Sequence, residues 1–169
     1  MQAKDARALS TDDFDAFVEG LDYPMFIVTT AADGEPAGCL VGFTTQASID
    51  PPRLLVALSE KNHTYRVAQR AEVLAVHVVD SDADEIAQLF GGETGDEVDK
   101  FAQCSWRPGP DGVPLLEDCP RVVVGRILDR QVYGDHVGHL LEPIEVEGGG
   151  SQESMGFDDV KDLDPGHDA

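Results

Sequence analysis

A chain of 169 residues, of which 41% are hydrophobic, is long enough to fold as one domain around a buried core. Its 33 acidic residues against 12 lysines and arginines give a formal net charge of −21 at pH 7. A field of that sign repels nucleic acid and anionic membranes, and no uncharged apolar stretch approaches the roughly 20 residues of a membrane-spanning helix. Nucleic acid and membranes are therefore excluded as expected partners.

The N-terminus and the cysteines favour a protein of the reducing cytoplasm. Residues 1–7 are polar and lack the apolar core of a secretory signal. The cysteines Cys39, Cys104 and Cys119 are odd in number and widely spaced, without a CxxC pair. This pattern favours neither a disulfide framework nor a thiolate metal site, so we expect three small, inert thiols.

The first part of the chain predicts a helix followed by a β-hairpin. Thr11 is a candidate N-cap, and strands are expected over residues 24–30 and 38–43, on either side of an Asp33-Gly34 turn. The apolar residues of the helix share one stripe, namely Phe14, Phe17, Val18 and Leu21.

Residues 44–71 predict an edge segment, a buried strand and a helix in close succession. The polar segment 44–48 ends near Pro51-Pro52, where proline favours a turn because it offers no N–H to a sheet. The apolar run 54–58 suits a buried strand, and Asn62 is a good N-cap. The inward stripe of the following helix is Thr64, Val67, Ala68 and Ala71.

The second half of the chain predicts three more strands around one helix. Strands are expected over 73–79, 122–128 and 137–146, with Pro143 making the last an edge or bulged strand. The helix is expected to begin at Ser81. Its inward residues are Ala83, Ile86, Ala87 and Phe90.

Glycine and proline mark the irregular segments. Residues 91–101 form a Gly-rich loop, and residues 106–114 are expected to be irregular because they combine prolines with glycines. The domain is expected to span residues 1–147, followed over 148–169 by a linker and an acidic tail on the surface.

Mostly hairpin-connected strands with a few short helices predict a mainly β fold, a closed or partly closed antiparallel barrel. Side chains fill the interior of a barrel of this size, so a large ligand is expected outside it.

Few residues offer chemistry of their own. His136 and His139, three apart on a strand, point to opposite faces and do not favour a metal site, and His77 is expected to be a satisfied strand histidine. The chain has no GxSxG, P-loop or GxGxxG motif. What remains is an anion site at a helix start, made of Lys61, Asn62, His63, Thr64 and Lys100. The alternative is an ordinary strand–helix junction, with Lys100 as a solvated charge.

Seven short segments occur in an order typical of a known family. They are Val28-Thr29-Thr30 with the Asp33-Gly34 turn, Pro36-Ala37-Gly38, residues 48–52, Asn62-His63-Thr64, Phe90-Gly91-Gly92 with Asp99-Lys100-Phe101, residues 106–116, and Gly134-Asp135-His136. Over roughly residues 13–147 the chain resembles the flavin reductase-like family of FMN-binding split barrels. The resemblance implies a Greek-key-like split barrel that forms a homodimer, with FMN near the subunit interface.

The resemblance also implies site residues. For the flavin ring and ribityl chain it points to Val41, Gly42, Phe43, Thr44, Thr45, Gln46 and Ser48, and for the phosphate to Ser59, Lys61, Asn62, His63, Thr64, Lys100 and Phe101. It implies that His136 faces the nicotinamide of NADH or NADPH and is the candidate catalytic residue. It implies no metal.

The implied activity is hydride transfer from NAD(P)H to FMN, with a monooxygenase as a candidate recipient of the reduced flavin. Such chemistry belongs to the cofactors, so the protein needs only to stack the rings and exclude water. Two alternatives stay open: a flavin-binding or electron-carrying protein without turnover, and a split barrel that holds haem or a deazaflavin.

Overall fold

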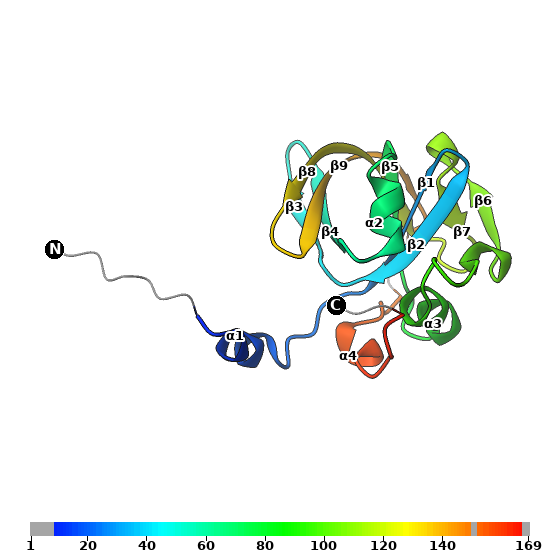
Figure 1. Cartoon of the computed structure of the whole chain (residues 1–169). Coiled ribbons are helices and arrows are strands. Elements are labelled where there is room, and N and C mark those ends of the chain that lie inside the picture. The colour runs from blue at the N-terminus through cyan, green and yellow to red at the C-terminus, as the bar shows by residue number, and fades with distance from the viewer. Residues whose placement is uncertain (1–8, 150–151, 167–169) are drawn as a thin grey trace.

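A computed structural model describes residues 9–149 and 152–166. The strands form a curved barrel with α2, α3 and α4 packed against it, whereas α1 stands beside it (Figure 1). The helices are α1 (Thr11–Val18), α2 (His63–Ala68), α3 (Asp84–Gly92) and α4 (Phe157–Val160). The strands are β1 (Phe26–Ala32), β2 (Glu35–Val41), β3 (Thr44–Ser48), β4 (Arg53–Ser59), β5 (Val73–Val78), β6 (Trp106–Pro108), β7 (Pro114–Leu116), β8 (Val122–Val132) and β9 (His136–Glu147). No described helix is both long and apolar enough to cross a membrane.

Seven strands form one sheet in the order β2-β1-β5-β8-β9-β4-β3, with every neighbouring pair antiparallel. The chain passes from β2 at one edge to β3 at the other through Gly42 and Phe43 alone. The backbone N–H of Ala57 on β4 donates to the carbonyl of Phe43 at 2.8 Å. The two edges therefore lie close together, which confirms the partly closed barrel.

Local sequence signals explain the elements next to the barrel opening. β1 and β2 pair around Asp33 and Gly34, whose φ angles of 52° and 77° suit an Asp-Gly hairpin turn. The Asn62 side chain accepts a hydrogen bond from the backbone N–H of Thr64 at 2.9 Å and caps α2 as predicted. The predicted inward stripe is buried and consists of Thr64, Val67, Ala68 and Ala71.

Two apolar clusters stabilise the fold. One, contributed by strands all round the barrel, includes Val28, Val56, Leu58, Leu74 and Leu141. The other lies between the sheet, α3 and the C-terminal residues and includes Met25, Ile27, Phe90, Leu116 and Met155. The cysteines are inert as expected, because burial raises the pKa values of Cys39, Cys104 and Cys119.

His77 is a structural residue, as the sequence predicts. Its Nδ1 donates to the carbonyl of Ile27 at 3.0 Å, while its Nε2 accepts from the backbone N–H of Leu116 at 3.1 Å. One donor and one acceptor require the neutral ring, and burial lowers the pKa of His77 to about 4.

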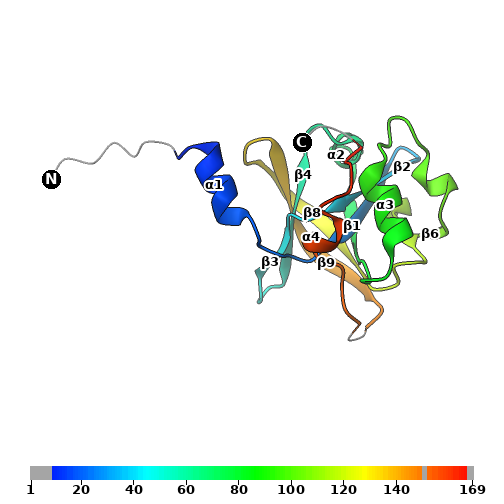
Figure 2. The ribbon, with the colours of Figure 1, turned by 90° about the horizontal axis from the view of Figure 1, so that it is seen from below.

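Helix α1 differs from the expectation of a packed amphipathic helix. Its N-cap is Ser10 rather than Thr11, and the Ser10 hydroxyl accepts from the backbone N–H of Asp13 at 3.2 Å. None of its residues is buried, and Phe17 is 71% exposed. Both views place the helix outside the barrel (Figures 1 and 2).

Three other boundaries are corrected. Residues 106–114 are irregular only over 109–113, because β6 and β7 pair as a hairpin whose prolines, Pro108 and Pro114, sit opposite each other at the end of the ladder. α3 begins after Ala83, not at Ser81. β8 and β9 are longer than predicted, and the bulge expected at Pro143 appears as a register shift opposite Gly125.

The C-terminal segment (residues 152–166) corrects the expectation of a surface tail. Met155 is fully buried in the same cluster as Met25. Isolated bridges join Gly156 to Pro24 and Ser154 to Asp80. Figure 2 shows α4 against the barrel beside α3. Apolar residues spaced by three inside an acidic sequence (Phe157, Val160 and Leu163) explain why this segment packs down.

Candidate functional site

A cavity of about 320 Å³ lies on the outer side of the barrel, between the strand β2 and the C-terminal segment. We call it the uncharged cavity, because no Asp, Glu, Lys or Arg is among its described lining residues. These are Tyr23, Met25, Cys39, Leu40, Val41, Gly42, Phe43, Ala57, Leu58, Ser59, Asn62, Gly91, His136, Phe157, Val160, Leu163 and Pro165. In a chain of net charge −21, such a lining is a place where an anionic ligand would contact no carboxylate of the wall itself.

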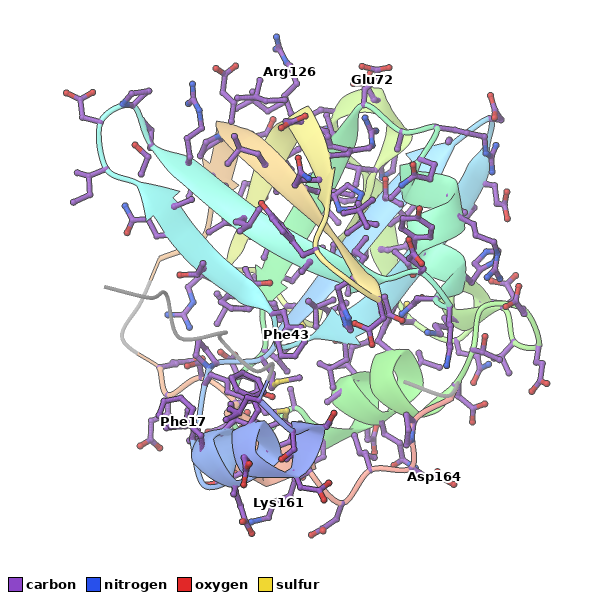
Figure 3. All side chains as sticks on the ribbon, turned by 60° about the vertical axis from the view of Figure 1, so that its left-hand side comes forward. Phe17, Phe43, Glu72, Arg126, Lys161 and Asp164 are labelled. Carbon is purple, nitrogen blue, oxygen red and sulfur yellow. The ribbon has the colours of Figure 1, made fainter. Side chains whose placement is uncertain are left out.

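Aromatic rings form a row along this cavity. The Phe157 ring stacks on Tyr23 at 4.9 Å and 17°, Tyr23 lies 6.4 Å from Phe43, and Phe43 lies 5.0 Å from His136. A Cβ on Gly42 would come within 2.4 Å of the Tyr23 ring, so the absence of a side chain there lets Tyr23 pack on the backbone. Figure 3 shows Phe43 at the end of the barrel that faces α1. The row offers flat apolar surfaces to a planar ligand.

The other end of the row is polar. Ser59 and His136 are directly opposite each other on β4 and β9, and Asn62 follows at the start of α2. Nδ1 of His136 lies 2.7 Å from the Asp135 carboxylate, to which it donates. This hydrogen bond lowers the pKa of Asp135, and it fixes the imidazole orientation with Nε2 available to a ligand.

A second cavity of about 330 Å³ lies further along β2, and we call it the acidic cavity. Its lining includes Glu35, Asp96, Glu97 and Asp99. His63 points into this set, with Nε2 3.2 Å from Glu35 and Nδ1 3.1 Å from Asp96. Arg66 also binds Asp96 and, as the largest cause, lowers the pKa of its carboxyl group. The Arg66 guanidinium beside this cavity is therefore already paired with a carboxylate.

Lys100 belongs to the acidic cavity but is committed to the backbone. Its side chain is 4% exposed, and Nζ donates to the carbonyls of Gly38 at 3.0 Å and Phe90 at 3.1 Å. Burial lowers its pKa. Lys100 thus joins β2 to the end of α3 and is not a solvated charge, whereas its phosphate-binding role stays a prediction.

The structure divides the predicted site residues. The uncharged cavity brings together Val41, Gly42, Phe43, Ser59, Asn62 and His136. The acidic cavity takes His63, Lys100 and Phe101. The polar edge strand β3 carries Thr44, Thr45, Gln46 and Ser48, of which Thr44 has a buried hydroxyl without a hydrogen-bond partner. Lys61 lies close enough to Asp135 to lower its pKa, and Thr64 is buried beneath the site.

Sequence reasoning missed the walls of the uncharged cavity. Tyr23 and Met25 precede β1, in a stretch without any binding motif. The C-terminal segment adds Phe157, Val160, Leu163 and Pro165. The spacing of three between its apolar residues is the one signal that could have revealed this wall.

An antiparallel split barrel with an uncharged, partly aromatic cavity on its outer side defines a class of cofactor-binding barrels. Within that class, the chain belongs to the flavin reductase like domain family, whose sequence profile residues 18–159 match.

Individual relatives agree. The chain is 32% identical over 110 residues to FMN reductase (NADH) RutF of Bradyrhizobium diazoefficiens, covering 65% of this chain and 61% of that protein. It is 28% identical over 117 residues to an Escherichia coli 4-hydroxyphenylacetate 3-monooxygenase reductase component, covering 69% of each. The solved structure of a Streptomyces globisporus NADH:FAD oxidoreductase superposes with a TM-score of 0.78 at 22% identity, covering 89% and 92% of the two chains, which supports the fold. Against three curated relatives, the chain spans only 40%, 61% and 53% of their length.

Proposed function

We propose that this protein is an FMN reductase that binds FMN in the uncharged cavity and transfers a hydride to it from NADH or NADPH. The observation that carries the proposal is the lining of that cavity, which lacks carboxylates although the chain has 33. A flavin mononucleotide combines a planar ring with an anionic phosphate, so it needs flat apolar walls and no fixed negative charge.

The residues present fit this cofactor. Tyr23 and Phe43 offer ring faces for the isoalloxazine, and Ser59 and Asn62 offer a hydroxyl and an amide for the ribityl phosphate. The bound flavin supplies the hydride-accepting chemistry. The protein positions the rings and excludes water through the apolar residues Met25, Leu40 and Leu58.

His136 is the proposed catalytic residue, which contacts the nicotinamide. Asp135 holds its Nδ1–H, so Nε2 is the atom that faces the ligand. Phe43, 5.0 Å from His136, is half exposed and forms the adjoining wall of the cavity. The imidazole therefore acts by orienting the nicotinamide, since hydride transfer between the two cofactors needs no protein nucleophile.

Two partners belong to the proposal. A monooxygenase is the proposed recipient of reduced flavin, because a relative is named as the reductase component of such an enzyme. A second copy of this chain is the other, because Phe14 and Phe17 of α1, and Leu21 just after it, are at least half exposed. An eight-residue helix is marginal in isolation and gains stability when such a face is covered.

The function is tested by titrating FMN into the full chain and following NADH and NADPH oxidation with excess FMN. We expect saturable FMN binding and oxidation well above the protein-free rate. Tight FMN binding with oxidation at the protein-free rate would identify a flavin carrier instead. Absence of FMN binding would overturn the proposal.

The dimer is tested by light scattering of the wild type and of Phe17→Asp. We expect a mass of two chains for the wild type and a shift toward one chain for the variant. Lys161→Asp serves as the control. Lys161 is also exposed but lies in a turn after α4, so this variant adds an acidic residue without changing α1. A monomeric wild type at micromolar concentration would contradict the proposed dimer.

A further inference from the structure

The C-terminal segment is built into the outer side of the barrel. The backbone N–H of Met25 donates to Met155 O, the N–H of Met155 to Val79 O, and the N–H of Phe157 to Tyr23 O, each at 2.8 Å. Met155 is fully buried. These contacts fix the start of the segment, so the residues that follow α4 have a defined course.

Beyond α4 the segment crosses to the end of α3. Leu163 Cδ1 lies 3.6 Å from where a Cβ on Gly91 would stand. A Cβ on Gly166 would lie 2.5 Å from the carbonyl carbon of Glu93, so the backbones of Gly166 and Glu93 are in contact. Leu163 and Pro165 therefore form the wall of the uncharged cavity between α4 and α3.

This wall stands on the side of the cavity where the phosphate is expected. Although burial, the larger effect, raises the pKa of the Cys39 thiol on β2, Asn62 and Thr64 lie close enough to that thiol to lower its pKa. The next residue, Leu40, packs on Gly91, whose missing Cβ would lie 2.8 Å from the Leu40 side chain. Asn62, Cys39, Leu40, Gly91 and Leu163 thus follow one another along one continuous side of the cavity.

We propose that Leu163 and Pro165 make the cavity selective for FMN over FAD; this inference rests on the proposed function. A flavin whose ring lies along the aromatic row has its phosphate near Asn62, and a dinucleotide has to continue past that point. Related proteins of this fold are named for FMN and for FAD, so the barrel itself does not decide between them. A wall at the phosphate end of the cavity can decide between the two flavins, because only FAD extends beyond that phosphate.

Charge adds to the shape of the wall. Asp162 and Asp164 flank Leu163 and are exposed. Figure 3 shows Lys161 and Asp164 at the end of the molecule opposite Arg126 and Glu72. A second phosphate leaving the cavity on this side would meet two carboxylates, whereas the single phosphate at Asn62 stays within the uncharged lining.

The test compares FMN and FAD affinities by calorimetry for the wild type, for Leu163→Ala, and for a chain that ends at Lys161. The shortened chain keeps Met155, Phe157 and Val160, which anchor the segment. Leu128→Ala is the matched control, because Leu128 is also a partly exposed leucine and lies on β8, outside the cavity. We expect both test variants to raise the ratio of FAD to FMN affinity by about tenfold, the effect of removing a side chain that limits a pocket, and the control to leave it unchanged.

Two results separate the inference from the proposed function. A wild type that binds FMN, with an affinity ratio that neither variant alters, would overturn the inference alone. A wild type that binds FAD as tightly as FMN would do the same. A wild type that binds neither flavin would overturn the proposed function and the inference with it.

Discussion

The two cavities share the strand β2 yet differ in charge. Residues 35–38 line the acidic cavity, together with Asp96, Glu97 and Asp99, while residues 39–41 line the uncharged cavity. The volumes are nearly equal, at about 330 and 320 Å³. Size therefore does not distinguish the two, and charge does.

The difference teaches where an anion can bind in a strongly acidic protein. Cations alone do not mark the place, because Arg66 is paired with Asp96, and Lys100 donates to two backbone carbonyls. These donor groups already have partners within the protein. The place is marked instead by polar donors in a lining without carboxylates, which is the arrangement around Asn62 and Ser59.

Acid is expected to give the largest effect, and to act on the buried His77 of the core before it acts on the carboxylates of the acidic cavity. The folded pKa of His77 is about 4 against 6.5 when unfolded, so the unfolded chain binds the extra proton first. Stability should fall as the pH drops from about 6.5 to 4, by about 3 kcal/mol, and then level off for this residue. The Asp96 pairs beside the acidic cavity have a lowered carboxyl pKa, so their contribution is lost only below pH 3.8.

Urea unfolding of the wild type and His77→Gln between pH 7 and 4 checks this expectation. Glutamine offers one donor and one acceptor to the carbonyl of Ile27 and the N–H of Leu116 but does not titrate in this range. The variant should lose less stability on acidification. Parallel pH profiles for the two proteins would show that His77 does not titrate as described.

Lys100→Met tests whether the buried lysine of the acidic cavity contributes to stability or to FMN binding. Methionine keeps an apolar stem but leaves the carbonyls of Gly38 and Phe90 without their donor. We expect the free energy of unfolding to fall by about 2 kcal/mol, while FMN affinity of the folded protein is retained. Lys161→Met, with a half-exposed side chain, is the control and should change neither quantity. A large loss of FMN affinity at unchanged stability would restore Lys100 to the cofactor site.

His136→Gln tests the polar end of the uncharged cavity. The amide retains hydrogen-bonding groups but loses the imidazole that Asp135 orients. We expect kcat/KM for the nicotinamide to fall by about tenfold, or roughly 1.4 kcal/mol, with FMN affinity retained. Equal losses in kcat/KM for the nicotinamide and in FMN affinity would show that His136 maintains the structure of the cavity rather than contacting the nicotinamide.

Much of this could be predicted from the sequence. The Asp33-Gly34 turn, the apolar run of β4 and the Asn62 cap each depend on local chemistry, and each appears as predicted. The order of short motifs likewise identified the family. Part of the site followed from these elements, because the lining residues Val41, Ser59 and Asn62 sit at their ends.

The rest depends on contacts between distant parts of the chain. Lys100 is scarce and charged in the sequence, but only the fold shows that it bonds to Gly38 O, 62 residues away. The fully buried Met155 lies in a segment whose composition suggests a surface tail. The stripe of α1, in contrast, has the periodicity of a packed helix but has no partner within the described residues. Composition and hydrophobic periodicity indicate that a segment can be buried. They do not indicate which part of the molecule, or which other chain, buries it.

The central claim is that an anionic flavin binds in the uncharged cavity and not in the acidic one. The most direct test measures FMN affinity for Asn62→Asp and Asp96→Asn, which have nearly the shapes of the original residues. Aspartate also caps helices, so the first variant adds a carboxylate while α2 keeps its N-cap. We expect Asn62→Asp to weaken FMN binding by about 2 kcal/mol and Asp96→Asn to leave it unchanged. Tighter binding by Asp96→Asn, with no loss in Asn62→Asp, would place the flavin in the acidic cavity and contradict the account.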